Sequence, residues 1–284
     1  MPAPAGLRVA ALQPSISIIL DRLGALDTLV ACTRYCVEAV PALAERSLTI
    51  VKDSWSCTTE EILAAKPGLV LASVPYRMES LAALLKSGCP VVTLAPHALA
   101  DIYADIRLIG SIVHRIEAAE SLVAEMQSEI AETRARTAEV LRPLVYCEEW
   151  GKPLIHSQPW VAELVEAAGG QFLGEAAKQT TAESIAAADP DVMILSWCGA
   201  GDRVPLERVI TQRQWQDLRA AREGNVFCIA DEWLNTPAPT LLFGLRALAA
   251  AIHPAQFNGR PSSQNERGMR ATDAAFPLRK AAPL

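Results

Sequence analysis

The stretch Glu60-Glu-Ile-Leu-Ala-Ala-Lys-Pro-Gly-Leu-Val-Leu-Ala-Ser73 occurs a second time as Glu183-Ser-Ile-Ala-Ala-Ala-Asp-Pro-Asp-Val-Met-Ile-Leu-Ser196. In each copy a threonine, Thr58 or Thr181, precedes a glutamate in the predicted first turn of a helix. A proline then ends the helix, and an apolar run typical of a buried strand follows. The repeat predicts two similar α/β lobes within one chain of 284 residues.

Short apolar runs alternate with amphipathic helical patterns along the rest of the chain. Unbroken runs of this length suit strands that are buried on both faces of a parallel sheet. The alternation therefore predicts an α/β fold with a parallel sheet in each lobe. The predicted strands are residues 8–12, 69–72, 91–94, 144–147, 192–195 and 226–229.

A long amphipathic segment separates the two lobes. Residues 101–140 contain no proline and one glycine, Gly110, and their apolar residues recur at three- and four-residue steps. This pattern predicts one long rigid helix of roughly 50 Å, and two helices broken near Gly110 are the alternative. The predicted organisation is an N-terminal lobe (7–100), a connecting helix (101–140), a C-terminal lobe (141–257) and a disordered tail (258–284). A cleft between the lobes is the expected place for a ligand.

The composition excludes several classes of function. The chain carries 26 basic and 32 acidic side chains, a net charge of −6, which argues against binding nucleic acid or an anionic membrane. It has no apolar run of 18 residues, so no membrane span is predicted. The N-terminus lacks the pattern of a secretory signal, and the seven cysteines are an odd number without regular spacing. These features favour a chain with reduced thiols and leave a cytoplasmic location open.

Motifs for catalysis and for metal binding are missing from the sequence. There is no Gly-x-Gly-x-x-Gly, no Walker A motif and no Gly-x-Ser-x-Gly, and the four histidines are far apart. The spacing Cys32-x3-Cys36 is interpreted as structural rather than metal-binding. We therefore expect no catalytic residue, no metal and no intrinsic cofactor.

Aromatic residues occupy turn positions, mostly after predicted strands. At the carboxyl ends of parallel strands they would line the ligand crevice, although individual tryptophans could instead fill the lobe cores. Together they predict a large, flat, partly apolar ligand held by stacking. These residues are Trp55, Tyr76, Trp150, Trp160, Trp197 and Trp233, with Trp215 as the exception.

The C-terminal half resembles a known family through an ordered series of short motifs. They include Glu149-Trp150, Gln158-Pro-Trp-Val-Ala-Glu-Leu164, Trp197-Cys-Gly199 and Ile252-His-Pro-Ala-Gln-Phe257. Their order is similar to that of vitamin B12-binding members of the helical-backbone periplasmic binding proteins. That family supplies the substrate-binding components of iron-siderophore, haem and cobalamin ABC importers. The resemblance covers about residues 7–257.

The resemblance implies two lobes bridged by a long helix, a corrinoid ligand and a location in the periplasm or at the cell surface. It implies corrinoid stacking on Trp55, Tyr76 and Trp197, with Pro14 at the floor of the cleft. It also implies that Glu60 and Glu183 dock a monomeric binding protein onto arginines of an importer permease. Further ligand contacts are expected from Tyr35, Trp150, Trp160, Asp231 and Trp233, with Asp231 accepting hydrogen bonds from ligand amides.

One departure from the family pattern leaves alternatives open. The family stretch Ser-Arg-Pro-Gly-Pro-Arg is Asn235-Thr-Pro-Ala-Pro-Thr240 here, so both arginines are absent. Besides a corrinoid, the same fold could bind an iron-siderophore or haem, with Tyr35 or Tyr76 as the axial ligand of haem iron. A cytosolic enzyme or sensor that uses the cleft for a soluble metabolite is the third hypothesis.

Overall fold

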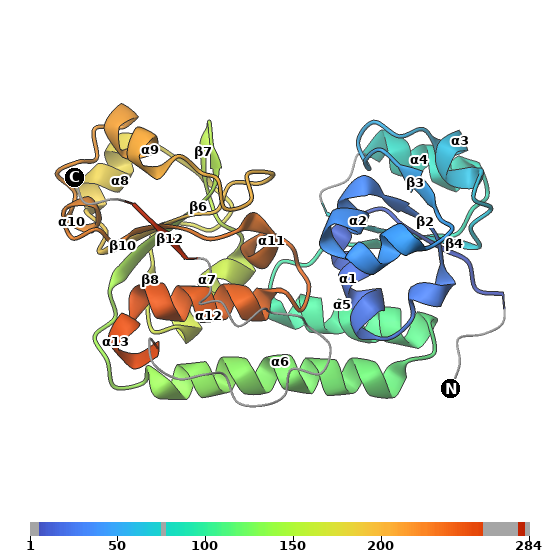
Figure 1. Cartoon of the computed structure of the whole chain (residues 1–284), viewed down its shortest axis with the longest axis horizontal. Helices are drawn as coiled ribbons and strands as arrows, with labels where there is room; N and C mark the ends of the chain where they lie inside the picture. Colours follow the sequence, from blue (N-terminus) through green and yellow to red (C-terminus); the bar gives the residue numbers. More distant parts are fainter. Residues whose placement is uncertain (1–5, 75–77, 258–277, 282–284) are drawn as a thin grey trace. The chain divides into compact units, whose positions relative to one another are not determined.

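The computed structural model describes residues 6–74, 78–257 and 278–281, and the chain divides into two compact units (Figure 1). The N-terminal unit comprises Met1–Glu125 with Pro237–Pro239, and the C-terminal unit comprises Met126–Thr236 with Thr240–Leu284. Each unit is built around its own β-sheet with helices packed on it. The prediction of an α/β chain with two lobes is confirmed.

The N-terminal sheet has five strands in the order β3-β2-β1-β4-β5, and all of its strand pairs are parallel. The central strand β1 is buried along its length, because neighbouring strands and helices cover both edges and both faces. The strands are β1 (Val9–Ala11), β2 (Leu29–Thr33), β3 (Thr49–Val51), β4 (Leu69–Ser73) and β5 (Val91–Leu94).

Helices of the N-terminal unit begin where the sequence provides starting signals. Pro14 is the first residue of α1, and Thr58 and Glu61 form a capping box at the start of α3. The helices are α1 (Pro14–Arg22), α2 (Arg34–Ala39), α3 (Thr59–Leu63), α4 (Met78–Lys86) and α5 (Leu99–Ile112), with 3₁₀ turns η1 (Leu26–Thr28) and η2 (Pro41–Glu45).

The C-terminal sheet is mixed, whereas the sequence predicts a parallel one. Strands β6, β8, β10 and β11 are parallel, but β7 returns antiparallel beside the end of β6 after a short turn. The order is β12-β11-β10-β6-β7-β9, with β8 paired to β6. The strands are β6 (Leu144–Gly151), β7 (Leu154–His156), β8 (Gln171–Phe172), β9 (Gln179–Thr180), β10 (Val192–Leu195), β11 (Val226–Cys228) and β12 (Arg279–Lys280).

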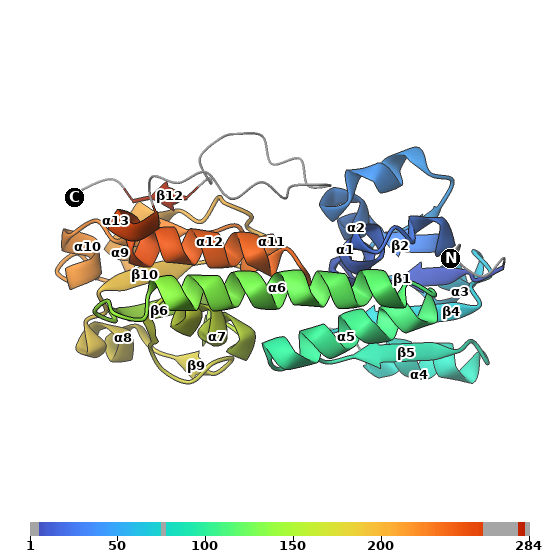
Figure 2. The same ribbon diagram turned by 90° about the horizontal axis from the view of Figure 1, so that it is seen from below.

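Helices cover both faces of the C-terminal sheet. One face carries a core around the fully buried Trp215, and the other carries Val145, which lies close to α7 and α12. Both views show α12 alongside the part of α6 that belongs to this unit (Figure 2), and Arg246 binds Glu129 there. The helices are α7 (Pro159–Ala167), α8 (Ala182–Ala188), α9 (Leu206–Gln212), α10 (Arg219–Arg222), α11 (Asp231–Leu234), α12 (Leu241–Ile252) and α13 (Pro254–Phe257).

The prediction of one continuous helix over 101–140 is wrong. The segment consists of α5 (Leu99–Ile112) and α6 (Ile116–Arg136), as in the alternative of two helices. His114 between them has a left-handed backbone with φ of 55°, which ends the helical path. A side chain at Gly110 would place its Cβ 2.4 Å from Ala119 Cβ, so glycine allows the start of α6 to pack closely against α5.

Part of the predicted disordered tail is ordered. Arg279 and Lys280 form β12, which pairs antiparallel with β11 through Cys228 and Phe227. The backbone N–H of Ala281 also donates to the Val226 carbonyl at 2.9 Å. The low apolar content of this segment did not predict a strand, because backbone hydrogen bonds hold it to the sheet and, of residues 278–281, only Ala281 is buried in the core. Residues 258–277 and 282–284 lie outside the described residues.

Candidate functional site

Each sheet has a topological switch point, where later strands are added on the opposite side of the first strand. It lies between β1 and β4 in the N-terminal sheet and between β6 and β10 in the C-terminal sheet. Ligands of open α/β sheets bind outside the carboxyl ends of the strands at such points. The residues that directly follow these strands are therefore the first candidates for ligand contact.

Pro14 lies at the N-terminal switch point. It follows β1 and opens α1, and its side chain is partly exposed. The neighbouring Gln13 is buried, and its Oε1 accepts a hydrogen bond of 2.7 Å from the backbone N–H of Ser73 at the end of β4. This bond joins the two strand ends and fixes the position at which Pro14 meets solvent.

Two aromatic side chains extend the same edge beyond β2 and β3. Tyr35, in the first turn of α2, is 40% exposed, and the Arg34 guanidinium donates to its hydroxyl at 2.7 Å. Trp55 follows β3 and is 44% exposed. The Asp53 carboxylate accepts from the backbone N–H of Trp55 at 2.8 Å, which shapes the loop that presents the indole. Both aromatic groups are thus available to a ligand.

A buried ion pair holds Trp197 at the C-terminal switch point. Glu148, the last residue of β6 that pairs with β10, is fully buried and accepts hydrogen bonds of 2.6 and 2.9 Å from Arg213. The same carboxylate accepts from Trp197 Nε1 at 2.7 Å and from the Tyr146 hydroxyl at 2.5 Å. The indole also packs on Gly151, where an added Cβ would lie 2.5 Å from Trp197 Cζ2. Trp197 is therefore fixed in orientation while its side chain stays partly exposed.

Glu149 follows Glu148 but lies on the opposite face of the sheet. It accepts a hydrogen bond of 2.7 Å from Gln158 Nε2, and the Cys198 thiol lies 3.6 Å from its other oxygen. Burial raises the pKa of the Glu149 carboxyl. Neither glutamate was predicted as a site residue, although two carboxylates directly after a predicted buried strand are a recognisable signal.

The remaining tryptophans of the C-terminal unit differ in exposure. Trp150 is 44% exposed near the end of β6, and its indole N–H donates to the Lys152 carbonyl at 3.0 Å. Trp233, on α11, is partly exposed and lies 5.6 Å from the Phe243 ring. The prediction for Trp160 is wrong. It is 3% exposed on the inner face of α7 and donates to the Leu234 carbonyl at 2.8 Å, so its side chain belongs to the core.

Asp231, which was expected to accept hydrogen bonds from ligand amides, is bound by the protein's own backbone. Its two carboxylate oxygens accept hydrogen bonds from the backbone N–H groups of Gly199 at 2.7 Å and Gly201 at 2.8 Å. It therefore orders the loop that follows Trp197. The position of Tyr76 lies outside the described residues.

Glu60 and Glu183 occupy equivalent places in the two units. Each is the second residue of its helix, α3 or α8, and each side chain is exposed. Hydrogen bonds from its own backbone N–H and from the Thr181 hydroxyl lower the pKa of the Glu183 carboxyl, so it is charged at neutral pH. Neither residue belongs to the strand ends described above.

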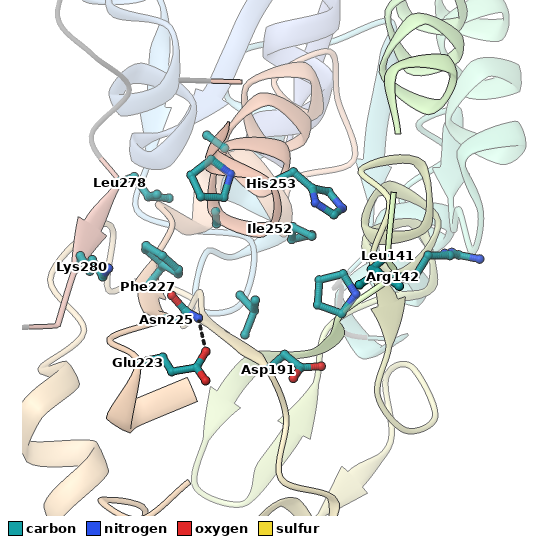
Figure 3. A pocket seen from close by; sticks show the side chains of 15 residues that line it. Leu141, Arg142, Asp191, Glu223, Asn225, Phe227, Ile252, His253, Leu278 and Lys280 are labelled. Atoms are coloured by element: carbon teal, nitrogen blue, oxygen red, sulfur yellow. Dashed lines mark hydrogen bonds between the residues drawn. The ribbon is translucent and has the colours of Figure 1, made fainter. Parts of the chain in front are cut away.

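A pocket of about 720 Å³ lies at the amino ends of the parallel strands of the C-terminal sheet, opposite the switch point (Figure 3). Asp191 and Asn225 from before β10 and β11 line it, together with Ile252 and His253. Asp191 is bound to Arg219. The pocket is thus separated from the switch point by the length of the strands.

A model of the family described as "Periplasmic binding protein" matches residues 9–232, which include the strand ends of both sheets. The chain belongs to this family. The family assignment confirms the resemblance that the sequence motifs indicate.

Relatives of this periplasmic binding protein include two with a named ligand. A cobalamin-binding protein of Halobacterium salinarum is 23% identical over 258 residues, covering 87% of this chain and 69% of the relative. A vitamin B12-binding protein of Yersinia pestis is 25% identical over 259 residues, covering 87% of each chain.

Solved structures share the fold at lower identity. A periplasmic heme binding protein from Pseudomonas aeruginosa has a TM-score of 0.77 and 21% identity, covering 88% of this chain and 93% of its own. The vitamin B12 binding protein of Vibrio cholerae has a TM-score of 0.71 and 23% identity, with coverages of 90% and 98%. An ABC transporter substrate-binding protein from Listeria monocytogenes has a TM-score of 0.73 and 18% identity, with coverages of 89% and 100%. These similarities establish a two-lobed binding-protein fold.

Three further observations describe this binding protein. Within residues 6–74, 78–257 and 278–281, no cluster of three or more histidine, cysteine or acidic side chains has the arrangement of a metal site. In the same ranges, every helix is too short or too polar to cross a membrane. All seven cysteines are free thiols, and Cys198 is the exposed one.

Proposed function

We propose that this periplasmic binding protein captures a corrinoid such as cobalamin and delivers it to the permease of an ABC importer, in the periplasm or at the cell surface. The observation that carries the proposal is Trp197, a partly exposed indole held rigidly at a switch point by Glu148. The relatives named for cobalamin and vitamin B12 support it.

A corrin ring is broad, flat and partly apolar, so it gains affinity from aromatic surface. Stacking on an aromatic side chain contributes about 0.5–1.5 kcal/mol beyond the burial of its area. Each unit presents such a surface at the carboxyl edge of its own sheet. Trp55, Tyr35 and Pro14 contribute from the N-terminal unit, and Tyr76 joins them as the family resemblance implies. The C-terminal unit contributes Trp150, Trp197 and Trp233.

Titration with cyanocobalamin, followed by quenching of tryptophan fluorescence, tests the proposal. Trp197→Ala and Trp55→Ala are each expected to weaken binding by about 10-fold, because each removes a large contact surface. Trp160→Phe is the matched control, since Trp160 is buried in the core and its replacement should leave the affinity unchanged. The absence of a response up to about 100 μM cyanocobalamin, well above the Kd of a specific receptor, would overturn the corrinoid assignment.

Haem is the second candidate, and the pairing of Tyr35 with Arg34 favours it. A phenolate oxygen can ligate haem iron, and the Arg34 guanidinium, 2.7 Å from the hydroxyl and 4.7 Å from the ring centroid, would stabilise its charge. If haem is the ligand, the wild-type protein shifts the Soret band of haemin and Tyr35→Phe abolishes the shift. A haemin spectrum that is identical with both proteins would exclude this role of Tyr35.

We further propose that Glu60 and Glu183 dock the protein onto basic residues of the permease. Two exposed carboxylates on equivalent helices suit a partner with two-fold symmetry. The double variant Glu60→Lys/Glu183→Lys is expected to bind ligand with unchanged affinity but to lose most ligand uptake in a reconstituted importer. Glu117→Lys, at another exposed position, is the control. A loss of ligand affinity in the double variant would instead place these residues in the ligand site.

A further inference from the structure

Five polar side chains gather at the C-terminal switch point on the face of the sheet that α7 covers. They come from the ends of four different elements: Glu149 in β6, Ser157 after β7, Ser196 and Cys198 after β10, and Asn235 after α11. Hydrogen bonds join the members from β6, β10 and α11, and Ser157 N–H donates to the Cys147 carbonyl two residues before Glu149. We refer to these five residues as the acceptor cluster.

Glu149 is the charged member of the acceptor cluster, and its surroundings differ from those of Glu148. Glu148 is neutralised by Arg213, whereas within the described part of the chain Glu149 forms no ion pair and is bound by the uncharged Gln158 and Cys198. Its carboxyl is largely buried, and burial raises its pKa. A carboxylate in such a place is stabilised by any further N–H group that approaches it.

Three other members of the cluster carry a buried oxygen without a partner among the described residues. These oxygens are Ser157 Oγ, Ser196 Oγ and Asn235 Oδ1, and Ser157 and Ser196 are fully buried. The orientation of the Asn235 amide is fixed, because its Nδ2 donates to the Ser196 carbonyl at 2.7 Å and lies 3.3 Å from Cys198 Sγ. The opposite orientation would place Oδ1 against the Ser196 carbonyl. Asn235 therefore presents an acceptor rather than a donor.

The cluster is complementary to a group that donates hydrogen bonds. A primary amide offers two N–H donors and can satisfy Glu149 and Asn235 together. A carboxylate in the same place would face Glu149 with a like charge and leave Asn235 Oδ1 unsatisfied. Asp231, which the sequence suggested for amide recognition, already accepts from Gly199 and Gly201.

We propose that the acceptor cluster binds a primary amide on the rim of the ligand and thereby selects an amidated tetrapyrrole over a carboxylated one. The inference rests on the proposed corrinoid function and adds the chemical feature that the C-terminal unit recognises. In the complex, Glu149 and Asn235 accept from the amide N–H groups.

The test compares two corrinoids that share one ring. Dicyanocobinamide carries amides on its rim, and dicyanocobyrinic acid carries carboxylates at the same positions. The wild-type protein is expected to bind dicyanocobinamide at least about 10-fold more tightly, because a site built for donors rejects an analogue without them. In Glu149→Gln, which removes the charge at constant shape, affinity for the amide form should fall and affinity for the acid should rise. The ratio of the two affinities should drop by about 10-fold.

Glu132→Gln, an exposed position on α6, is the control and should keep the wild-type ratio. A ratio of affinities measured on one protein sample does not depend on the fraction that is folded, so a loss of stability in Glu149→Gln would not produce the expected change. Equal binding of both corrinoids by the wild-type protein, or an unchanged ratio in Glu149→Gln, overturns the inference and leaves the proposed function intact. Failure of both corrinoids to bind overturns the proposed function and the inference with it.

Discussion

Replacement of Glu148 by alanine is expected to lower the free energy of unfolding of the C-terminal unit by about 3–5 kcal/mol. The change leaves the Arg213 guanidinium, whose side chain is 12% exposed, as an unpaired charge inside the protein. It also removes the acceptor for the Trp197 indole and the Tyr146 hydroxyl. Urea unfolding followed by tryptophan fluorescence measures the effect, because five of the six tryptophans belong to this unit.

An exposed ion pair provides the comparison. In the same unit Glu166 binds Arg142, but their side chains are 44% and 50% exposed, so Glu166→Ala should cost less than about 1 kcal/mol. A Glu148→Ala protein with a similarly small loss of stability would show that water reaches Arg213 and that the ion pair does not hold Trp197.

A second large effect is expected from Gly244→Ala in the first turn of α12. The added Cβ would lie 2.2 Å from the Trp233 carbonyl oxygen and 2.6 Å from Leu234 Cδ2. The first of these contacts is with backbone, so α11 or α12 must shift, at a cost of about 3 kcal/mol. This loss exceeds the gain in helix propensity from glycine to alanine, which is about 1 kcal/mol.

Thermal unfolding measured by circular dichroism would show the effect of Gly244→Ala as a lower midpoint. Gly68→Ala is the control, because the nearest atom to its added Cβ is the Arg8 carbonyl oxygen at 3.8 Å, an ordinary contact. A Gly244→Ala protein as stable as the wild type would mean that α11 moves away from α12 without loss.

The sequence predicted the strands that are continuous apolar runs. The run at 192–195 is β10, whose four residues are all buried, because a strand covered on both faces needs apolar side chains at every position. The run at 91–94 is the edge strand β5, in which Leu94 is buried and Thr93 is exposed. The edge strand β3 was not predicted, since Ile50 in its middle is 51% exposed and no apolar run marks it. The length of β6 was underestimated for a related reason. The apolar run ends at Cys147, and the strand continues through Glu148 and Glu149 to the residues that pair with β7.

The candidate site was predicted in part. Trp197 follows the predicted strand at 192–195, and the structure places it just after β10. Trp55 follows β3, a strand that was not predicted. Trp160 was assigned wrongly because it was read as a turn residue. Its spacing to Val161 and Leu164 matches the buried face of α7. The contact between Glu148 and Arg213 joins residues 65 positions apart, and no local pattern predicts such a pair.

The pairing of β12 with β11 has a practical consequence for the design of expression clones. A chain truncated after α13 would leave the carbonyl and N–H groups of β11 unpaired along an outer strand that contains Phe227 and Cys228. Such an open strand is a template for addition of another chain and hence for aggregation. The short strand β12 thus covers the backbone hydrogen-bonding groups of β11, and clones that end beyond Ala281 retain this cover.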